Sequence, residues 1–120
     1  MAFDNSILSI NPATEETLGS YQLHNEEQVD RALMRASRTY NSWRTESFAK
    51  RAALMKKAGA YIRQHNNKFS SLMTAEMGKP ITESDAEAEK CAWNCDYYAE
   101  NAERFLSNEP RESKATDSFI

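Results

Sequence analysis

The sequence is poor in glycine, histidine and cysteine, and each shortage excludes a class of chemistry. Its three glycines, Gly19, Gly59 and Gly78, are too far apart to form the closely spaced glycine loop that cradles a pyrophosphate. The two histidines, His24 and His65, lack the neighbours expected of a general base beside a nucleophile, and they show no metal-ligand spacing. The sequence alone therefore indicates no catalytic, cofactor-binding or metal-binding residue.

Cysteine is limited to Cys91 and Cys95, too few for a disulfide framework. Four residues apart in a helical pattern, the two thiols share a helix face, and a disulfide between them would be strained. We expect both to be small, reduced and buried core residues. A complete small enzyme that uses one of them as nucleophile is the least favoured interpretation, since no base or cationic neighbourhood that would activate a thiol is evident.

The sequence also lacks a strong charge of one sign and any long apolar run. A net charge of -3 and a pI of about 5.4 give no electrostatic footprint for nucleic acid or for an anionic membrane. No apolar run approaches the roughly 20 residues of a membrane span, and no signal peptide is recognisable. We therefore expect a cytoplasmic protein that binds neither nucleic acid nor membrane.

What is present predicts one unit over residues 1–120, mainly α-helical with an N-terminal β-hairpin. The hairpin covers about 6–23, with strands at 6–10 and 17–23 joined by turn-forming residues that include Pro12. Four helices cover about 25–106. An isolated hairpin is marginally stable in water, so this one needs a surface to lie against.

Helical periodicity begins after Asn25, a predicted N-cap that forms a capping box with Gln28. The first helix carries an apolar stripe at spacings of three and four: Val29, Leu33, Ala36, Tyr40 and Trp43. A second helix begins near Ser47, and its basic residues are expected to form a solvated face. Its predicted buried side is Phe48, Ala52, Met55, Gly59 and Ile62.

A third helix is predicted over 67–77, ended by Gly78 and Pro80 and burying Phe69, Leu72, Met73 and Met77. Thr82 is the predicted N-cap of a fourth helix. One side of this helix is lined by Ala88, Cys91, Ala92, Cys95, Tyr98, Ala99, Ala102 and Phe105. Trp93 and Tyr97 mark a second apolar side. Two buried sides imply more neighbours than the rest of the chain easily supplies.

The last residues read differently from a natural domain end. Residues 107–114 form a polar connection, and a strand is expected to start over about 115–120. The chain then stops on Phe119 and Ile120, whereas natural ends are usually polar. We expect a fragment whose next strand is missing.

Five landmarks in register give a resemblance across residues 10–106: Ile10-Asn11-Pro12-Ala13-Thr14, Trp43, Arg51, Glu76-Met77-Gly78-Lys79-Pro80 and Tyr97-Tyr98-Ala99. Together they resemble the amino-terminal segment of NAD(P)-dependent aldehyde dehydrogenases. Within that family, Ala92-Trp93-Asn94, the following Tyr-Tyr-Ala-Glu and Glu-Arg-Phe-Leu are most similar to bacterial succinate-semialdehyde dehydrogenases. The resemblance implies an incomplete piece of the α/β aldehyde dehydrogenase fold. It also implies that the fourth helix runs beside the substrate tunnel.

The resemblance implies a mechanism that these residues cannot carry. In the family, a cysteine thiolate attacks the aldehyde, the thiohemiacetal passes hydride to NAD(P)⁺, and a glutamate-activated water hydrolyses the thioester. The Gly-Gln-x-Cys-like segment of that nucleophile does not occur here. Trp93-Asn94 lacks the prolines and phenylalanine of the family's oxyanion motif. We therefore carry over no catalytic residue and expect this fragment to bind no cofactor. Binding of NAD or NADP is expected only of the full-length family.

Two functions from different classes follow. The first is an amino-terminal fragment of an enzyme that oxidises succinate semialdehyde to succinate, catalytically incompetent alone. Its expected partners are the remainder of the enzyme and, in the full-length protein, further copies in a homo-oligomer. The alternative is a stand-alone helical module that binds a protein partner through its exposed stripe.

Overall fold

The structure, a computed structural model, describes residues 5–110, 112 and 114. Its elements are β1 (Ser6–Ile10), β2 (Thr17–Gln22), α1 (Glu26–Trp43), α2 (Phe48–Gln64), α3 (Asn66–Met77) and α4 (Ile81–Phe105). The predicted class, mainly α with an N-terminal antiparallel hairpin, is confirmed. The strand expected over 115–120, with Phe119 and Ile120, lies outside the described residues.

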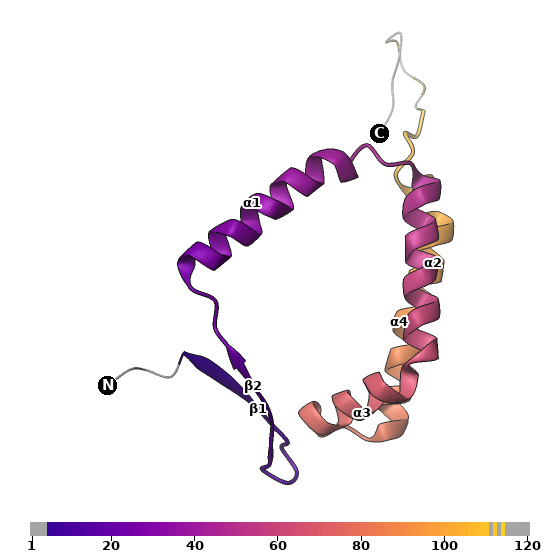
Figure 1. Cartoon of the computed structure of the whole chain (residues 1–120). Coiled ribbons are helices and arrows are strands. Elements are labelled where there is room, and N and C mark those ends of the chain that lie inside the picture. The colour runs from indigo at the N-terminus through magenta and orange to yellow at the C-terminus, as the bar shows by residue number, and fades with distance from the viewer. Residues whose placement is uncertain (1–4, 111, 113, 115–120) are drawn as a thin grey trace.

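The elements form an open arc (Figure 1). Helices α2 and α4 lie side by side, and α3 turns away at one end of the pair. The hairpin and α1 stand apart from the α2–α4 pair on the other side of the arc. The radius of gyration is 21.1 Å, whereas a compact domain of this length has about 14 Å. The chain therefore does not close around one core.

Local sequence explains the hairpin and its tight turn. The Asn11 side-chain oxygen accepts hydrogen bonds from the backbone N–H groups of Ala13 (2.9 Å) and Thr14 (3.3 Å). Glu15 adopts a left-handed conformation with φ 61°. The hairpin touches the helices near this turn, where the Ser9 hydroxyl donates to Glu76 at 2.6 Å.

Three of the predicted helix ends are confirmed. Asn25 and Gln28 form the reciprocal capping box, with both bonds at 2.9 Å. The Ser47 side chain accepts from the backbone N–H of Lys50 and caps α2. Gly78 ends α3 in the left-handed conformation with φ 71°. These helix boundaries are set by local chemistry.

The predicted start of α4 is wrong. Pro80 is the N-cap, and its carbonyl accepts hydrogen bonds from the backbone N–H groups of Glu83 and Ser84. Thr82 therefore lies inside the first turn and does not cap it. No side chain caps this end. The ring of Pro80 fixes φ at -57°, which suits entry into a helix without a capping side chain.

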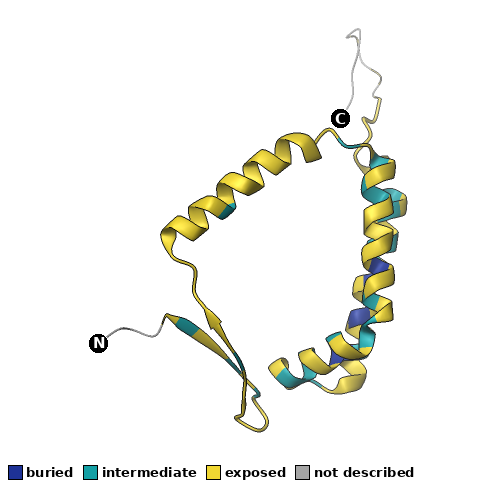
Figure 2. Ribbon diagram, in the orientation of Figure 1, coloured by how far each residue is buried: buried dark blue, intermediate teal, exposed yellow. Residues whose placement is uncertain are grey.

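The core is a crossing of small residues between α2, α3 and α4 (Figure 2). The buried residues of the described chain are Gly59, Ser70, Ser84, Ala88 and Ala92. A Cβ added to Gly59 would lie 3.0 Å from the Ala92 carbonyl oxygen and 3.2 Å from the Cβ of Cys95. Glycine at position 59 therefore allows α2 and α4 to approach closely. On the α3 side, the hydroxyls of Thr74 and Ser84 are hydrogen-bonded at 3.0 Å.

Several predicted buried faces are uncovered in the structure. The whole stripe of α1 is exposed, with Leu33 63% and Tyr40 59% accessible. Met55, Leu72, Met77, Tyr98 and Phe105 are exposed on the other helices. Trp93 and Tyr97, on the second side of α4, are exposed as well. The apolar pattern was identified correctly, but no element of the described chain lies over these faces.

Candidate functional site

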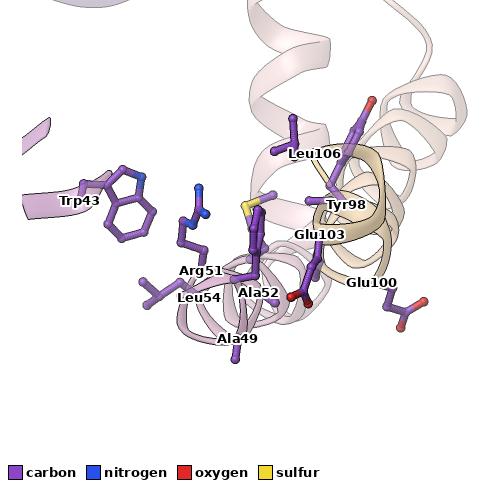
Figure 3. Close-up of a pocket in the computed structure, with 13 residues that line it drawn as sticks. Trp43, Ala49, Arg51, Ala52, Leu54, Tyr98, Glu100, Glu103 and Leu106 are labelled. Atoms are coloured by element: carbon purple, nitrogen blue, oxygen red, sulfur yellow. The ribbon is translucent and has the colours of Figure 1, made fainter. Parts of the chain in front are cut away.

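The candidate site is an apolar groove between the N-terminal half of α2 and the C-terminal end of α4. Its volume is about 520 Å³. It is lined by Trp43, Phe48, Ala49, Arg51, Ala52, Leu54, Met55, Tyr98, Ala99, Glu100, Ala102, Glu103 and Leu106. We call it the α2–α4 groove, and Figure 3 shows its lining residues.

Residue size explains why this groove is hollow. After the Ser47 cap, Phe48, Ala52 and Met55 recur along one side of α2. Across from them, α4 offers Ala99 and Ala102 to the groove. The alanine side chains are small, so they leave space beside the phenylalanine and the methionine. The groove is therefore a consequence of sequence, lined mainly by carbon.

Arg51 is the unusual polar residue of the groove. Its guanidinium carbon lies 4.3 Å from the centre of the Phe48 ring, a cation–π contact. Its Nε is buried, and no hydrogen-bond acceptor for it is found in the described part of the chain. Buried donors almost always have a partner. The Nε of Arg51 therefore lacks an acceptor among the described residues.

A second uncovered feature is the aromatic face of α4. The rings of Trp93 and Tyr97 are stacked with centres 5.3 Å apart, and Tyr97 contacts Phe105 at 6.0 Å. All three side chains are exposed. Stacked rings that share a face of a helix are typical of a surface that another element covers.

Charged pairs tie the packed helices together on their outer side. Arg63 on α2 donates to Asp96 at 2.7 Å and to Glu89 at 2.9 Å, both on α4. These bonds, that to Asp96 first, raise the pKa of Arg63. A hydrogen bond from Lys79 lowers the pKa of Glu87. None of these residues lines the α2–α4 groove.

The cysteines only partly match their prediction. Cys91 is exposed and Cys95 is half-buried, so the expectation that both are core residues is wrong for Cys91. The covered side of α4 is centred on Ala88 and Ala92, and Cys91 lies beyond its edge. Cys95 is held near Gly59 of α2.

The histidines do not converge on a site. The His65 ring stacks on Tyr61 with centres 4.0 Å apart, and its Nδ1 lies 2.9 Å from the Tyr61 carbonyl oxygen. His24 is exposed between β2 and α1. Within residues 5–110, 112 and 114, no group of three or more His, Cys, Asp or Glu side chains could hold a metal. In the same residues, no helix is long and apolar enough to cross a membrane.

Comparisons with known proteins identify the family of the chain. The sequence model of the Aldehyde dehydrogenase family matches residues 2–120. The chain belongs to the aldehyde dehydrogenase family. It is 38% identical over 115 residues to a probable NADP⁺ succinate-semialdehyde dehydrogenase of Synechocystis, covering 96% of this chain and 25% of that relative. It is 39% identical over 107 residues to succinate-semialdehyde dehydrogenase [NADP(+)] 1 of Mycobacterium tuberculosis, covering 89% and 23%.

The solved structures agree with the sequence relatives. The NADP⁺ complex of succinic semialdehyde dehydrogenase from Streptococcus pyogenes superimposes with a TM-score of 0.87 at 31% identity. The match covers 93% of this chain and 25% of that one. The predicted resemblance is confirmed, and the fold is a piece of the aldehyde dehydrogenase fold. The chain spans about a quarter of the length of these relatives.

Sequence reasoning missed the α2–α4 groove and the role of Arg51 in it. Arg51 stood out only as a family landmark. A signal was present, because large apolar residues on the second helix face alanines at the end of the fourth. Depth and the missing acceptor depend on how the two helices cross, and only the structure gives that.

Proposed function

We propose that this chain is the amino-terminal quarter of an NADP-linked succinate-semialdehyde dehydrogenase, and that it is catalytically incompetent alone. The observation that carries the proposal is the large accessible surface of the chain. The accessible surface is 10129 Å², whereas a compact protein of this mass exposes about 6,600 Å². Together with its span of a quarter of its relatives, this excess supports a part that packs against a larger remainder.

The chemistry expected of the family supports the same proposal. Oxidation of succinate semialdehyde needs a thiolate nucleophile, an activated water and a nicotinamide to accept hydride. Cys91 and Cys95 lie mid-helix, and the three glycines are too far apart in sequence to form a phosphate loop. Those functions therefore belong to the remainder of the enzyme. NADP is the favoured cofactor of the whole, because the relatives named above are NADP⁺ enzymes.

The proposal includes partners and a location. The first partner is the remainder of the enzyme, which would cover α1, the aromatic face of α4 and the α2–α4 groove. Further copies would complete a homo-oligomer in the full-length protein. We expect that protein in the cytoplasm.

An activity assay of the chain with and without its complement tests the proposal. The chain is purified alone, and it is also co-expressed with the downstream three-quarters of the Synechocystis relative. Reduction of NADP⁺ by succinate semialdehyde is followed at the absorbance of NADPH. We expect no activity and no saturable NADP⁺ binding for the chain alone, and activity for the co-expressed pair. Turnover or saturable cofactor binding by the chain alone would contradict the proposal.

The alternative of a stand-alone helical interaction module is favoured by one observation, the exposed apolar stripe of α1. The capping box makes α1 a well-defined helix, and nothing in the described residues covers its apolar side. A monomeric chain that melts cooperatively and confers no activity on the downstream region would favour this alternative.

A further inference from the structure

We propose that the α2–α4 groove is the docking site of an apolar segment from the downstream region, and that this segment brings a hydrogen-bond acceptor to Arg51. The inference rests on the proposed function and deepens it, because it names one contact among those that the remainder would make. The occupant is a stretch of polypeptide with large apolar side chains. A backbone carbonyl or a carboxylate oxygen of that stretch lies against the guanidinium.

The lining of the groove selects an apolar occupant. Phe48, Met55 and Leu106 contribute carbon surface, and Ala102 leaves room between them. Trp43, the last residue of α1, borders the same space (Figure 3). Removal of this surface from water by apolar side chains is favourable in proportion to the area covered.

Arg51 adds a polar requirement. Its buried Nε has no acceptor in the described residues, and an unpaired buried donor is costly. The Phe48 ring lies against the guanidinium and restrains it. An incoming segment that supplied an oxygen there would gain a charge-assisted hydrogen bond, which is among the stronger kinds.

Nearby carboxylates do not already meet this need. Glu100 of α4 pairs with Lys56 at 3.4 Å. Glu46, just before α2, accepts a hydrogen bond from Lys50. Glu103 also lines the groove. None of these three carboxylates accepts a hydrogen bond from the Arg51 Nε, which favours an acceptor from outside the described residues.

Area favours the downstream region over a second copy as the occupant. The surface of the chain exceeds that of a compact protein by about 3,500 Å². Obligate interfaces typically bury about 2,000–5,000 Å² summed over both partners, so each partner loses about 1,000–2,500 Å², which is less than this excess. In the Streptococcus pyogenes enzyme, a segment with this backbone is one quarter of the chain. Three further quarters are a sufficient source for the segment, and a second copy is an outcome of the test.

The experiment measures capture of the downstream region in one cell. The tagged chain is co-expressed with the downstream three-quarters of the Synechocystis relative, and the ratio of the two chains after purification is read from a stained gel. Three variants test the groove: Arg51→Met, which keeps length and loses the donors, Arg51→Lys, which keeps charge, and Ala102→Trp, which fills the space. Arg38→Met, an exposed arginine of α1 away from the stripe, is the matched control.

We expect Arg51→Met and Ala102→Trp each to lower the captured downstream chain by about tenfold or more. The first variant removes a hydrogen bond to a charged group, which is a strong kind. The second occupies the space that the segment would fill. Arg51→Lys should fall between Arg51→Met and the unaltered chain, and Arg38→Met should stay within about twofold of it. Far-UV circular dichroism checks that each variant keeps its helices. If one groove variant loses them, the other still decides.

Three results would overturn the inference, and they are distinguishable. Capture by the unaltered chain that Arg51→Met and Ala102→Trp leave unchanged would remove the groove as a docking site, while the proposed function stands. No capture by the unaltered chain would overturn both. A dimer of the chain alone that the same two variants dissociate would make a second copy the occupant.

Discussion

The two halves of this molecule differ in how closely their helices and strands pack against other elements. Helices α2, α3 and α4 pack on one another and contain every buried residue of the described chain, Gly59, Ser70, Ser84, Ala88 and Ala92. The hairpin and α1 contain none. Yet α1 has a complete capping box, whereas α4 begins without any side-chain cap. Local capping therefore explains where helices form, and complementary surfaces explain which of them pack.

The largest expected effect comes from a substitution where α2 and α4 approach each other closely, at Gly59. Gly59→Leu places a side chain where a Cβ alone would lie 3.0 Å from the Ala92 carbonyl oxygen. We expect the free energy that protects α4 amides from hydrogen exchange to fall by about 1–3 kcal/mol. Ala58→Leu, on the exposed side of the same turn, is the control and should change little. Equal losses in both would mean that α2 and α4 do not approach at Gly59.

A substitution on the stripe of α1 sharpens the contrast. Leu33→Gln alters a side chain that nothing covers, so the amide protection of α2 and α4 should change by less than about 0.5 kcal/mol. Because an apolar patch is removed, self-association and dye binding should decrease. Ala92→Gln, at a position with 0% exposure, should instead disrupt the packed half. Sedimentation and hydrogen exchange measure the two effects, and a large loss of protection in Leu33→Gln would contradict the comparison.

The cysteines report the edge of the packed half. Cys91 is exposed and Cys95 is half-buried beside Gly59. We expect a maleimide to label Cys91 severalfold faster than Cys95 under native conditions, because access limits the reaction. Mass spectrometry of the labelled peptides over time gives both rates, with Cys91→Ser and Cys95→Ser as separate controls. Faster labelling of Cys95 would place the covered side of α4 elsewhere.

The smallest effect is the pH dependence of one exposed pair. The hydrogen bond from Lys79 lowers the pKa of Glu87. A carboxylate whose folded pKa is lowered stabilises the fold above its unfolded pKa, and this contribution is lost as pH falls through the folded value. Lys79→Met should return the pKa of Glu87 to its ordinary range, which a carboxyl titration by NMR measures. Lys57→Met, a neutralised exposed lysine elsewhere, should leave that titration unchanged.

Sequence reasoning predicted where helices and strands begin and end better than it predicted which of them pack together. The capping box of Asn25, the Ser47 cap and the left-handed Gly78 are local features, and all three were predictable. Thr82 was misassigned because the preceding proline can begin a helix without a side-chain cap. These cases show that short-range hydrogen bonding is readable from the chain itself.

Burial could not be predicted in the same way, because it depends on segments far apart in sequence or outside this chain. The apolar stripe of α1 has the right period, but periodicity gives a face and not its neighbour. The groove and the unpaired Arg51 Nε likewise depend on the crossing of α2 with α4. The family resemblance was visible because it rests on residue order alone.

Hydrogen exchange of the whole chain, resolved by peptide mass spectrometry, tests the central claim most directly. The claim is that the helices of residues 48–105 pack against one another, whereas the hairpin and α1 are stabilised only when the remainder of the enzyme packs on them. The account predicts protection concentrated in α2 and α4, with rapid exchange of β1, β2 and α1 at the same pH and temperature. Co-expression with the downstream region should then slow exchange in α1. Uniform protection along residues 6–105 in the chain alone would contradict the account.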